Sequence, residues 1–177
     1  MRRRILLLAL VACLLVGCST PRTYQGIRIE GPEDFQDNIE HALKLIEWKS
    51  PGQFKDVRRL VKKIGLVQNS PAPGLAAYCD SRDGIYFVQE QYDAILKQAE
   101  AHPPAVYAIP ALLVHETTHL VQVQEGRPAN SEEGEREALQ AEKGLLLSLG
   151  LPFDVVENAC SDDRLRSRHW EALGATQ

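Results

Sequence analysis

The stretch that decides the fold is Pro110-Ala111-Leu112-Leu113-Val114-His115-Glu116-Thr117-Thr118-His119-Leu120-Val121. Pro110 suits the first turn of a helix, and Gly126 with Pro128 beyond it is typical of a helix end. The pattern therefore predicts a helix that begins at residue 110 and ends before Gly126. Two imidazoles and a carboxylate are costly to bury among leucines and valines without partners, so we expect a chemical site here.

The spacing of the two histidines favours a metal site. His115 and His119 lie four residues apart, so they share one helix face and can bind one ion. Zn²⁺ takes nitrogen ligands of this kind at about 2.0–2.1 Å. Glu116 lies near the metal but off the ligand direction, where a carboxylate can act as general base toward a water molecule. The alternative is a pair of hydrogen-bonded core histidines.

A third ligand is expected from the next predicted helix, which Ser131 would cap and which runs to Leu149. The residues at helical spacing from Glu135 are mostly apolar: Ala138, Leu139, Glu142, Leu146 and Leu149. Those at helical spacing from Glu137 form a weaker stripe: Gln140, Ala141 and Gly144. A carboxylate on a buried face needs a cation, so we favour Glu135 and keep Glu137 as the alternative.

The segment His115 to His119 resembles the zincin metallopeptidases, and Glu135-Arg136-Glu137-Ala138 resembles the glutamate helix of the gluzincin branch. The resemblance extends over about residues 84–150. It implies an α+β fold, with helices around a small antiparallel sheet, in which a motif helix and a glutamate helix form the site. It also implies a zinc ion held by His115, His119 and Glu135, with Glu116 as the catalytic base for cleavage of a peptide or protein substrate.

The resemblance also points to supporting residues. Many family members have an aspartate where this chain has Leu139, so support for a histidine must come from elsewhere, and Glu142 is the candidate. The segment Ile85 to Val88 is expected to be an edge strand that aligns a peptide, or else plain sheet core. The candidates for stabilising the transition state are Tyr78, Tyr86 and His169.

The remaining pattern predicts one domain. Apolar residues at helical spacing predict two helices, with Phe35, Ile39, Leu43 and Ile46 in the first and Phe54, Val57, Leu60, Val61 and Ile64 in the second. Short segments at 65–67, 75–79 and 84–88 predict the antiparallel sheet, and a helix follows over 91–101. We expect residues 18–32 to be a linker and residues 33–177 to be a single zincin-like domain, with a further helix around 162–173.

The N-terminus resembles a bacterial lipoprotein signal. Arg2 to Arg4 precede an apolar run, Ile5 to Val16, that is shorter than the about 20 residues of a membrane span. Leu15-Val16-Gly17-Cys18 resembles the lipobox, which implies removal of residues 1–17 and lipidation of Cys18. Ser19 then implies the outer membrane, facing the periplasm. The alternative is an ordinary secretory signal with an incidental cysteine.

Charge and cysteine content complete the expectation. The formal charge of −4 becomes −4 − 3 = −7 once the three signal arginines are removed, so no nucleic-acid partner is expected. Cys79 and Cys160 remain as an even pair in an oxidising compartment, which predicts a disulfide; the alternative is two buried thiols. The rival to an enzyme is an envelope scaffold or partner-binding lipoprotein that keeps zinc for stability. The oligomeric state is left open.

Overall fold

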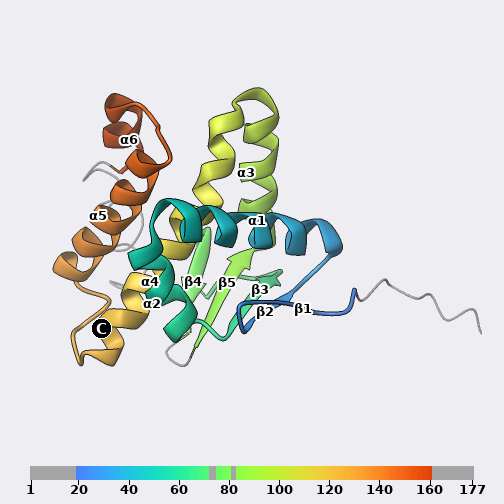
Figure 1. The fold of residues 1–177 in the computed structure, drawn as a ribbon, viewed down its shortest axis with the longest axis horizontal. Coiled ribbons are helices and arrows are strands. Elements are labelled where there is room, and N and C mark those ends of the chain that lie inside the picture. The colour runs from blue at the N-terminus through green and yellow to red at the C-terminus, as the bar shows by residue number, and fades with distance from the viewer. Residues whose placement is uncertain (1–18, 72–74, 81–82, 161–177) are drawn as a thin grey trace, which may run out of the picture.

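The computed structural model describes residues 19–71, 75–80 and 83–160. The signal peptide, Cys18, the expected helix around 162–173 and His169 lie outside these residues. The described chain forms helices packed on one five-stranded sheet, which confirms the α+β class (Figure 1). None of its helices is long and apolar enough to cross a membrane.

The strands are β1 (Arg22–Tyr24), β2 (Ile27–Glu30), β3 (Lys63–Val67), β4 (Ala77–Cys79) and β5 (Gly84–Val88). The helices are α1 (Glu33–Lys49), α2 (Pro51–Leu60), α3 (Gln89–Ala101), α4 (Ala108–Gln124), α5 (Glu132–Ser148) and α6 (Phe153–Ala159), with a 3₁₀ turn η1 (Pro103–Tyr107) before α4.

The sheet is mixed, so the expected antiparallel sheet is wrong. Its order is β1-β2-β3-β5-β4, in which β2, β3 and β5 are parallel and the two edge strands are antiparallel to their neighbours. The reason lies in the connections, because α1 and α2 form a crossover from β2 to β3 and a crossover returns a strand in the parallel direction. The second predicted helix accordingly ends at Leu60, and Ile64 lies in β3.

The edge position also differs from the expectation. Ile85 to Val88 belong to β5, which lies between β3 and β4, so they do not form an edge strand. The edge beside the motif helix is β4, which packs against α4. β4 and β5 form an antiparallel pair, with β4 on its outer side.

One face of the sheet carries the core. The inward-pointing side chains of the strands are fully buried: Ile27, Ile29, Ile64, Ile85 and Phe87. They pack against the predicted apolar stripe of α1, which contains Phe35, Ile39, Leu43 and Ile46. This core supports α4, whose residues from Ile109 to Thr117 are all buried.

The expected linker over 18–32 is wrong for the residues that the structure describes. β1 and β2 form a hairpin at one edge of the sheet. Its two-residue turn is Gln25-Gly26, with φ of 49° and 89°, which is the positive-φ pair that a type I′ turn requires. The domain therefore includes this segment, and the chain is part of the fold from Ser19 onward.

Candidate metal centre

Two histidines of α4 turn their Nε2 atoms toward each other. The distance between His115 Nε2 and His119 Nε2 is 3.2 Å, and the two rings meet edge to face. Both side chains are buried. The helix α4 is buried along most of its length, and α5 packs alongside it (Figure 1). The two histidines therefore lie inside the protein, next to α5.

The carboxylate of Glu135 closes the group from α5. Its Oε2 lies 3.5 Å from His115 Nε2, and its Oε1 lies 3.4 Å from His119 Nε2. A tetrahedral zinc ion with ligands at about 2.0–2.1 Å holds neighbouring ligand atoms about 3.3–3.4 Å apart. The two glutamate distances end on different carboxylate oxygens, but one ligand atom from each of the three residues lies within 4.8 Å of the others, so these residues form a group that could hold a metal ion.

The outer nitrogens of the two rings are held by hydrogen-bond acceptors. His115 Nδ1 lies 3.2 Å from Glu142 Oε2, and His119 Nδ1 lies 3.0 Å from Gln122 Oε1. Acceptors in these places favour a hydrogen on each Nδ1, which leaves the two Nε2 atoms as the ones available to bind a cation. The expectation that Glu142 supports a histidine is confirmed.

The electrostatics of the site favour positive charge. Burial lowers the pKa of His115, but hydrogen bonds to Glu135 and Glu142 and the charge of Glu116 outweigh it and raise this pKa to about 10. Three carboxylates, those of Glu116, Glu135 and Glu142, lie around the two imidazoles. Such a donor set, two nitrogens and a carboxylate with further acids behind them, fits a divalent cation.

The structure separates the two candidate glutamates. Glu137 does not join the cluster, because its carboxylate is bound by Arg127, with Nη1 to Oε2 at 2.5 Å, and by Gln122 Nε2 at 3.0 Å. These contacts, led by that with Arg127, lower the pKa of Glu137. Glu135 is the carboxylate that the fold brings to the histidines, as the apolar stripe predicted.

Gln122 is a residue of the candidate site that the sequence did not indicate as one. Its side chain is fully buried; Oε1 accepts from His119, while Nε2 donates to the carbonyl of Gly134 at 2.8 Å and to Glu137. One amide thus orients a ligand on α4 and ties it to the first turn of α5. A Cβ at Gly134 would lie 2.6 Å from the carbonyl oxygen of Ala129, so only glycine allows this approach. The sequence could have indicated this contact, because Gln122 follows His119 by three residues on the same helix.

Replacing this amide tests its role. Gln122→Leu should weaken metal binding by about 10–100-fold, the usual cost of losing a partner of a ligating histidine. Gln122→Glu keeps an acceptor for His119 and should lose less. Metal affinity is measured by competition with a chelator dye, with exposed Gln140→Leu on α5 as the control. Equal affinity in Gln122→Leu and the control would show that Gln122 has no role at the site.

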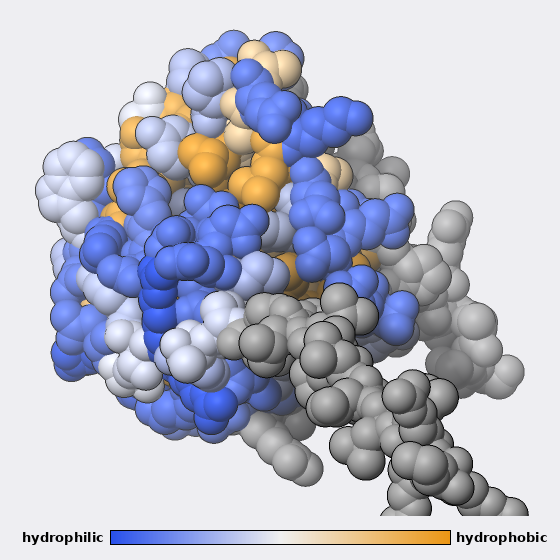
Figure 2. All heavy atoms as spheres, turned by 90° about the vertical axis from the view of Figure 1, so that its right-hand side faces the viewer, coloured by the Kyte–Doolittle hydropathy of each residue, from blue (hydrophilic) through white to orange (hydrophobic). Residues whose placement is uncertain are grey.

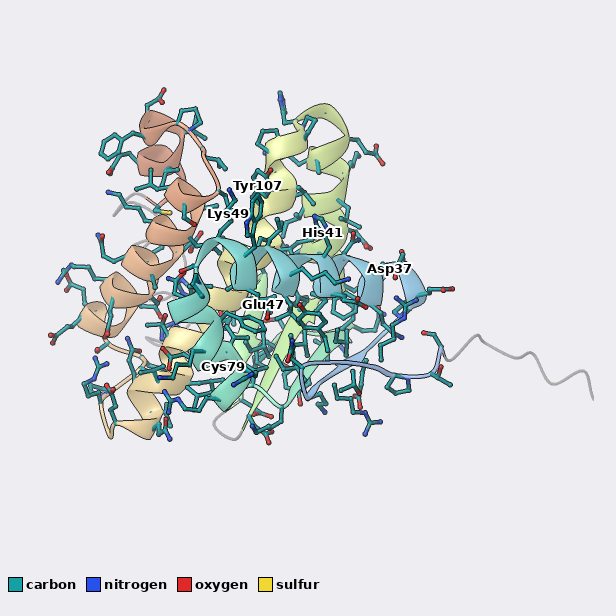
Figure 3. The ribbon with its side chains drawn as sticks, in the orientation of Figure 1. Asp37, His41, Glu47, Lys49, Cys79 and Tyr107 are labelled. Atoms are coloured by element: carbon teal, nitrogen blue, oxygen red, sulfur yellow. The ribbon has the colours of Figure 1, made fainter. Side chains whose placement is uncertain are left out.

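The general-base candidate Glu116 lies beside β4. Cys79, labelled in Figure 3, packs against the core on the same side of the sheet as its pairing partner Ile85, and its strand packs against α4. Burial, the charge of Glu116 and a side-chain hydrogen bond to Glu116 raise the pKa of the Cys79 thiol to about 12. The carboxylate of Glu116 is itself buried. The structure therefore places the proposed base between the histidine helix and the edge strand.

The predicted disulfide is not formed in the described chain, where Cys79 and Cys160 are both thiols. Cys79 packs at the main core, whereas Cys160 follows α6 and packs against a second cluster of Ala111, Leu146 and Val156. The prediction was based on an even number of cysteines and an oxidising compartment, and neither of these shows that the two side chains lie close together.

The raised pKa of Cys79 has a measurable result. An ordinary cysteine has a pKa of about 8.5, so at neutral pH Cys79 should react with iodoacetamide about a thousandfold more slowly. Peptide mass spectrometry of timed alkylation gives the rate, and the urea-unfolded protein is the control that should react normally. Rapid labelling of folded Cys79, or a mass that shows a Cys79–Cys160 disulfide, would contradict this arrangement.

The two tyrosine candidates do not reach the metal centre. Tyr78 and Tyr86 stack on each other, with ring centroids 5.4 Å apart. They alternate with Cys79 and Ile85 along their strands, so they lie on the sheet face opposite the core. Tyr86 contacts Lys63 and the hydroxyl donates to Asp80 at 3.4 Å. Neither is therefore placed to stabilise a transition state, and the third candidate, His169, lies outside the described residues.

Comparisons with protein-family models, with curated proteins and with solved structures found no match. Functional inference for this chain therefore rests on the geometry of the residues His115, His119 and Glu135 and of the groups around them.

Proposed function

We propose that the protein is a zinc-dependent hydrolase, a metallopeptidase that cleaves peptide bonds in the cell envelope. The observation that carries the proposal is the convergence of His115 Nε2, His119 Nε2 and the Glu135 carboxylate from two helices at separations suited to one ion. A bound zinc ion would supply a Lewis acid that polarises a carbonyl and lowers the pKa of water.

Three ligands favour catalysis over a purely structural role. Structural zinc sites fill all four positions with protein ligands, whereas catalytic sites keep one for water or substrate. Within the described part of the chain the ligand group consists of His115, His119 and Glu135 alone. This count supports the enzyme over the zinc-stabilised scaffold.

In this proposal Glu116 is the residue that transfers the proton. Its carboxylate follows His115 directly in α4 and lies beside the thiol of Cys79. In the proposed reaction it accepts a proton from the attacking water and later gives that proton to the nitrogen of the leaving amine. Gln122 and Glu142 keep the imidazoles in the orientation the site needs.

The edge strand β4 offers a place for the substrate backbone. Hydrogen bonds from Val88 to Ala76 and from Asp80 to Gly84 fix the antiparallel register, so Tyr78 is the strand residue whose backbone pairs with β5. The backbone groups of Ala77 and Cys79 then point away from the sheet. An extended peptide added there would pass along α4 beside Glu116.

The sequence supports a location in the cell envelope. Lipidation of Cys18, after removal of residues 1–17, would attach the protein to the membrane, and Ser19 favours the outer membrane facing the periplasm. The substrates are then peptides or proteins of that compartment.

The test combines two measurements on the purified mature protein. Elemental analysis should find about one zinc per chain, and a peptide-library assay should find cleavage that a chelator stops and added zinc restores. A metal-bound protein without cleavage of any peptide would favour the scaffold. Absence of metal binding, at concentrations where a catalytic site of this kind would fill, would overturn the zinc site itself.

A further inference from the structure

The first described residue is held by a buried side chain. Ser19 donates from Oγ to the carbonyl of Gly31 at 2.5 Å, and Gln36 Nε2 donates to Ser19 Oγ at 3.0 Å and to Gly31 at 2.7 Å. Gln36 belongs to α1 and is fully buried. Gln36 Nε2 also donates to the carbonyl of Thr20 at 3.3 Å, so three contacts of one buried amide fix the chain at Ser19 to the domain.

Two further contacts fasten the residues that follow Ser19 along α1. Arg22 of β1 forms ion pairs with Glu33 and Asp37, near the start of the helix. Tyr24 donates from its hydroxyl to Glu47 at 2.5 Å, near the end of the helix. The segment 19–24 is therefore attached at three places, and it does not behave as a spacer.

The expected lipid site is covalently next to this fixed point. Cys18 and Ser19 are joined by one peptide bond, so their Cα atoms are about 3.8 Å apart. A flexible ten-residue spacer would instead allow a spread of about 17 Å. An acyl group on Cys18 would thus enter the bilayer one residue from a rigid part of the domain.

We propose that the protein sits on the membrane in one orientation, with the β1 edge and the start of α1 at the lipid headgroups and the metal centre on the far side. The proposal rests on the lipid anchor of the proposed function. It assigns the surface around Ser19 to the bilayer and directs the metal centre toward chains that approach from the aqueous compartment, not toward membrane-embedded segments.

The topology separates the anchor from the metal centre. β1 and β4 are opposite edges of the sheet, four strand intervals of about 4.8 Å apart, or about 19 Å. Glu116 lies beside β4, and α5 packs farther out, on the side of the molecule away from the start of β1 (Figure 1). The face on the β1 side is mainly hydrophilic, with one hydrophobic patch in its upper part (Figure 2). Its hydrophilic part does not suit insertion among acyl chains.

The orientation is tested on the full lipidated protein in phosphatidylethanolamine–phosphatidylglycerol vesicles. A fluorescent non-canonical residue is placed at exposed Thr23 on β1 or at exposed Gln140 on α5, and quenching by headgroup-labelled lipid is measured. We expect strong quenching at position 23 and weak quenching at position 140. Equal quenching, or stronger quenching at position 140, would overturn the proposal.

A spacer variant serves as the matched control. Ten Ser and Gly residues, beginning with Ser, are inserted between Cys18 and Ser19, which leaves Ser after Cys18 and keeps the contacts of Ser19. The difference between the two labels should then be lost, and a difference that persists would show that Ser19 does not set the orientation. Mass spectrometry of the mature protein checks the acyl group on Cys18, and its absence would overturn the anchor. No readout uses metal or peptide cleavage, so these results stand apart from the hydrolase assay.

Discussion

Glu116→Gln is expected to keep the bound metal and to lose peptide hydrolysis by about 10²–10⁴-fold, the usual contribution of a general base. The amide has the size of the carboxylate, so the packing beside Cys79 should persist. It cannot accept a proton from water, however, so the attacking water remains a poor nucleophile. The ligands His115, His119 and Glu135 are unchanged, and metal content should be unchanged too.

The measurement pairs kcat/KM on a cleaved peptide with zinc content for each purified protein. Glu133→Gln is the matched control, because Glu133 is an exposed glutamate in the first turn of α5. If Glu116→Gln hydrolysed the peptide as fast as the control, Glu116 would not be the base. If the variant lost its metal, Glu116 would belong to the ligand set instead.

Glu135→Ala should reduce metal affinity more than any other single change on α5. The variant leaves two imidazoles without their carboxylate, and the loss should exceed the about 10–100-fold that follows removal of an outer partner. Glu137→Gln is the paired test, because the sequence offered both glutamates as the third ligand. It removes the charge that binds Arg127 but leaves His115, His119 and Glu135 in place.

Both variants are compared by zinc titration against a chelating dye, with circular dichroism to check that α5 remains folded. We expect wild-type-like affinity for Glu137→Gln, within a few fold, and little binding by Glu135→Ala. The reverse order would mean that Glu137 binds the metal in place of Glu135, which requires α5 to rotate by about half a turn, because residues two apart lie about 200° apart around a helix.

The candidate metal site could be predicted from the sequence because helical spacing is local. His115 and His119 must share a face if the segment is helical, and the apolar neighbours of Glu135 place it on the buried side of α5. The role of Glu142 follows in the same way, since it lies seven residues after Glu135 and on the same face. Each of these inferences needs only the repeat of one helix.

The predictions that were wrong concern contacts between segments that are far apart in the sequence. The parallel pairing of β2 with β3 depends on how α1 and α2 cross the sheet, which strand patterns alone do not show. Residues 18–32 were expected to be a linker, but Gly26 forms a hairpin turn and the carbonyl of Gly31 accepts hydrogen bonds from Ser19 and Gln36. The disulfide failed for the same reason, because cysteine counts contain no distances.

The candidate ligands lie on two helices, so a metal bound at this site would connect the lifetime of the protein to its metal supply. An ion bound by α4 and α5 together favours the folded state over any state in which α5 has detached. The gain grows with the logarithm of free metal concentration and reaches about 2.7 kcal/mol at a hundred times the dissociation constant. If the protein binds zinc in the cell envelope, as proposed, proteases of that compartment would degrade chains that open, and zinc starvation should shorten its half-life before it changes the amount synthesised.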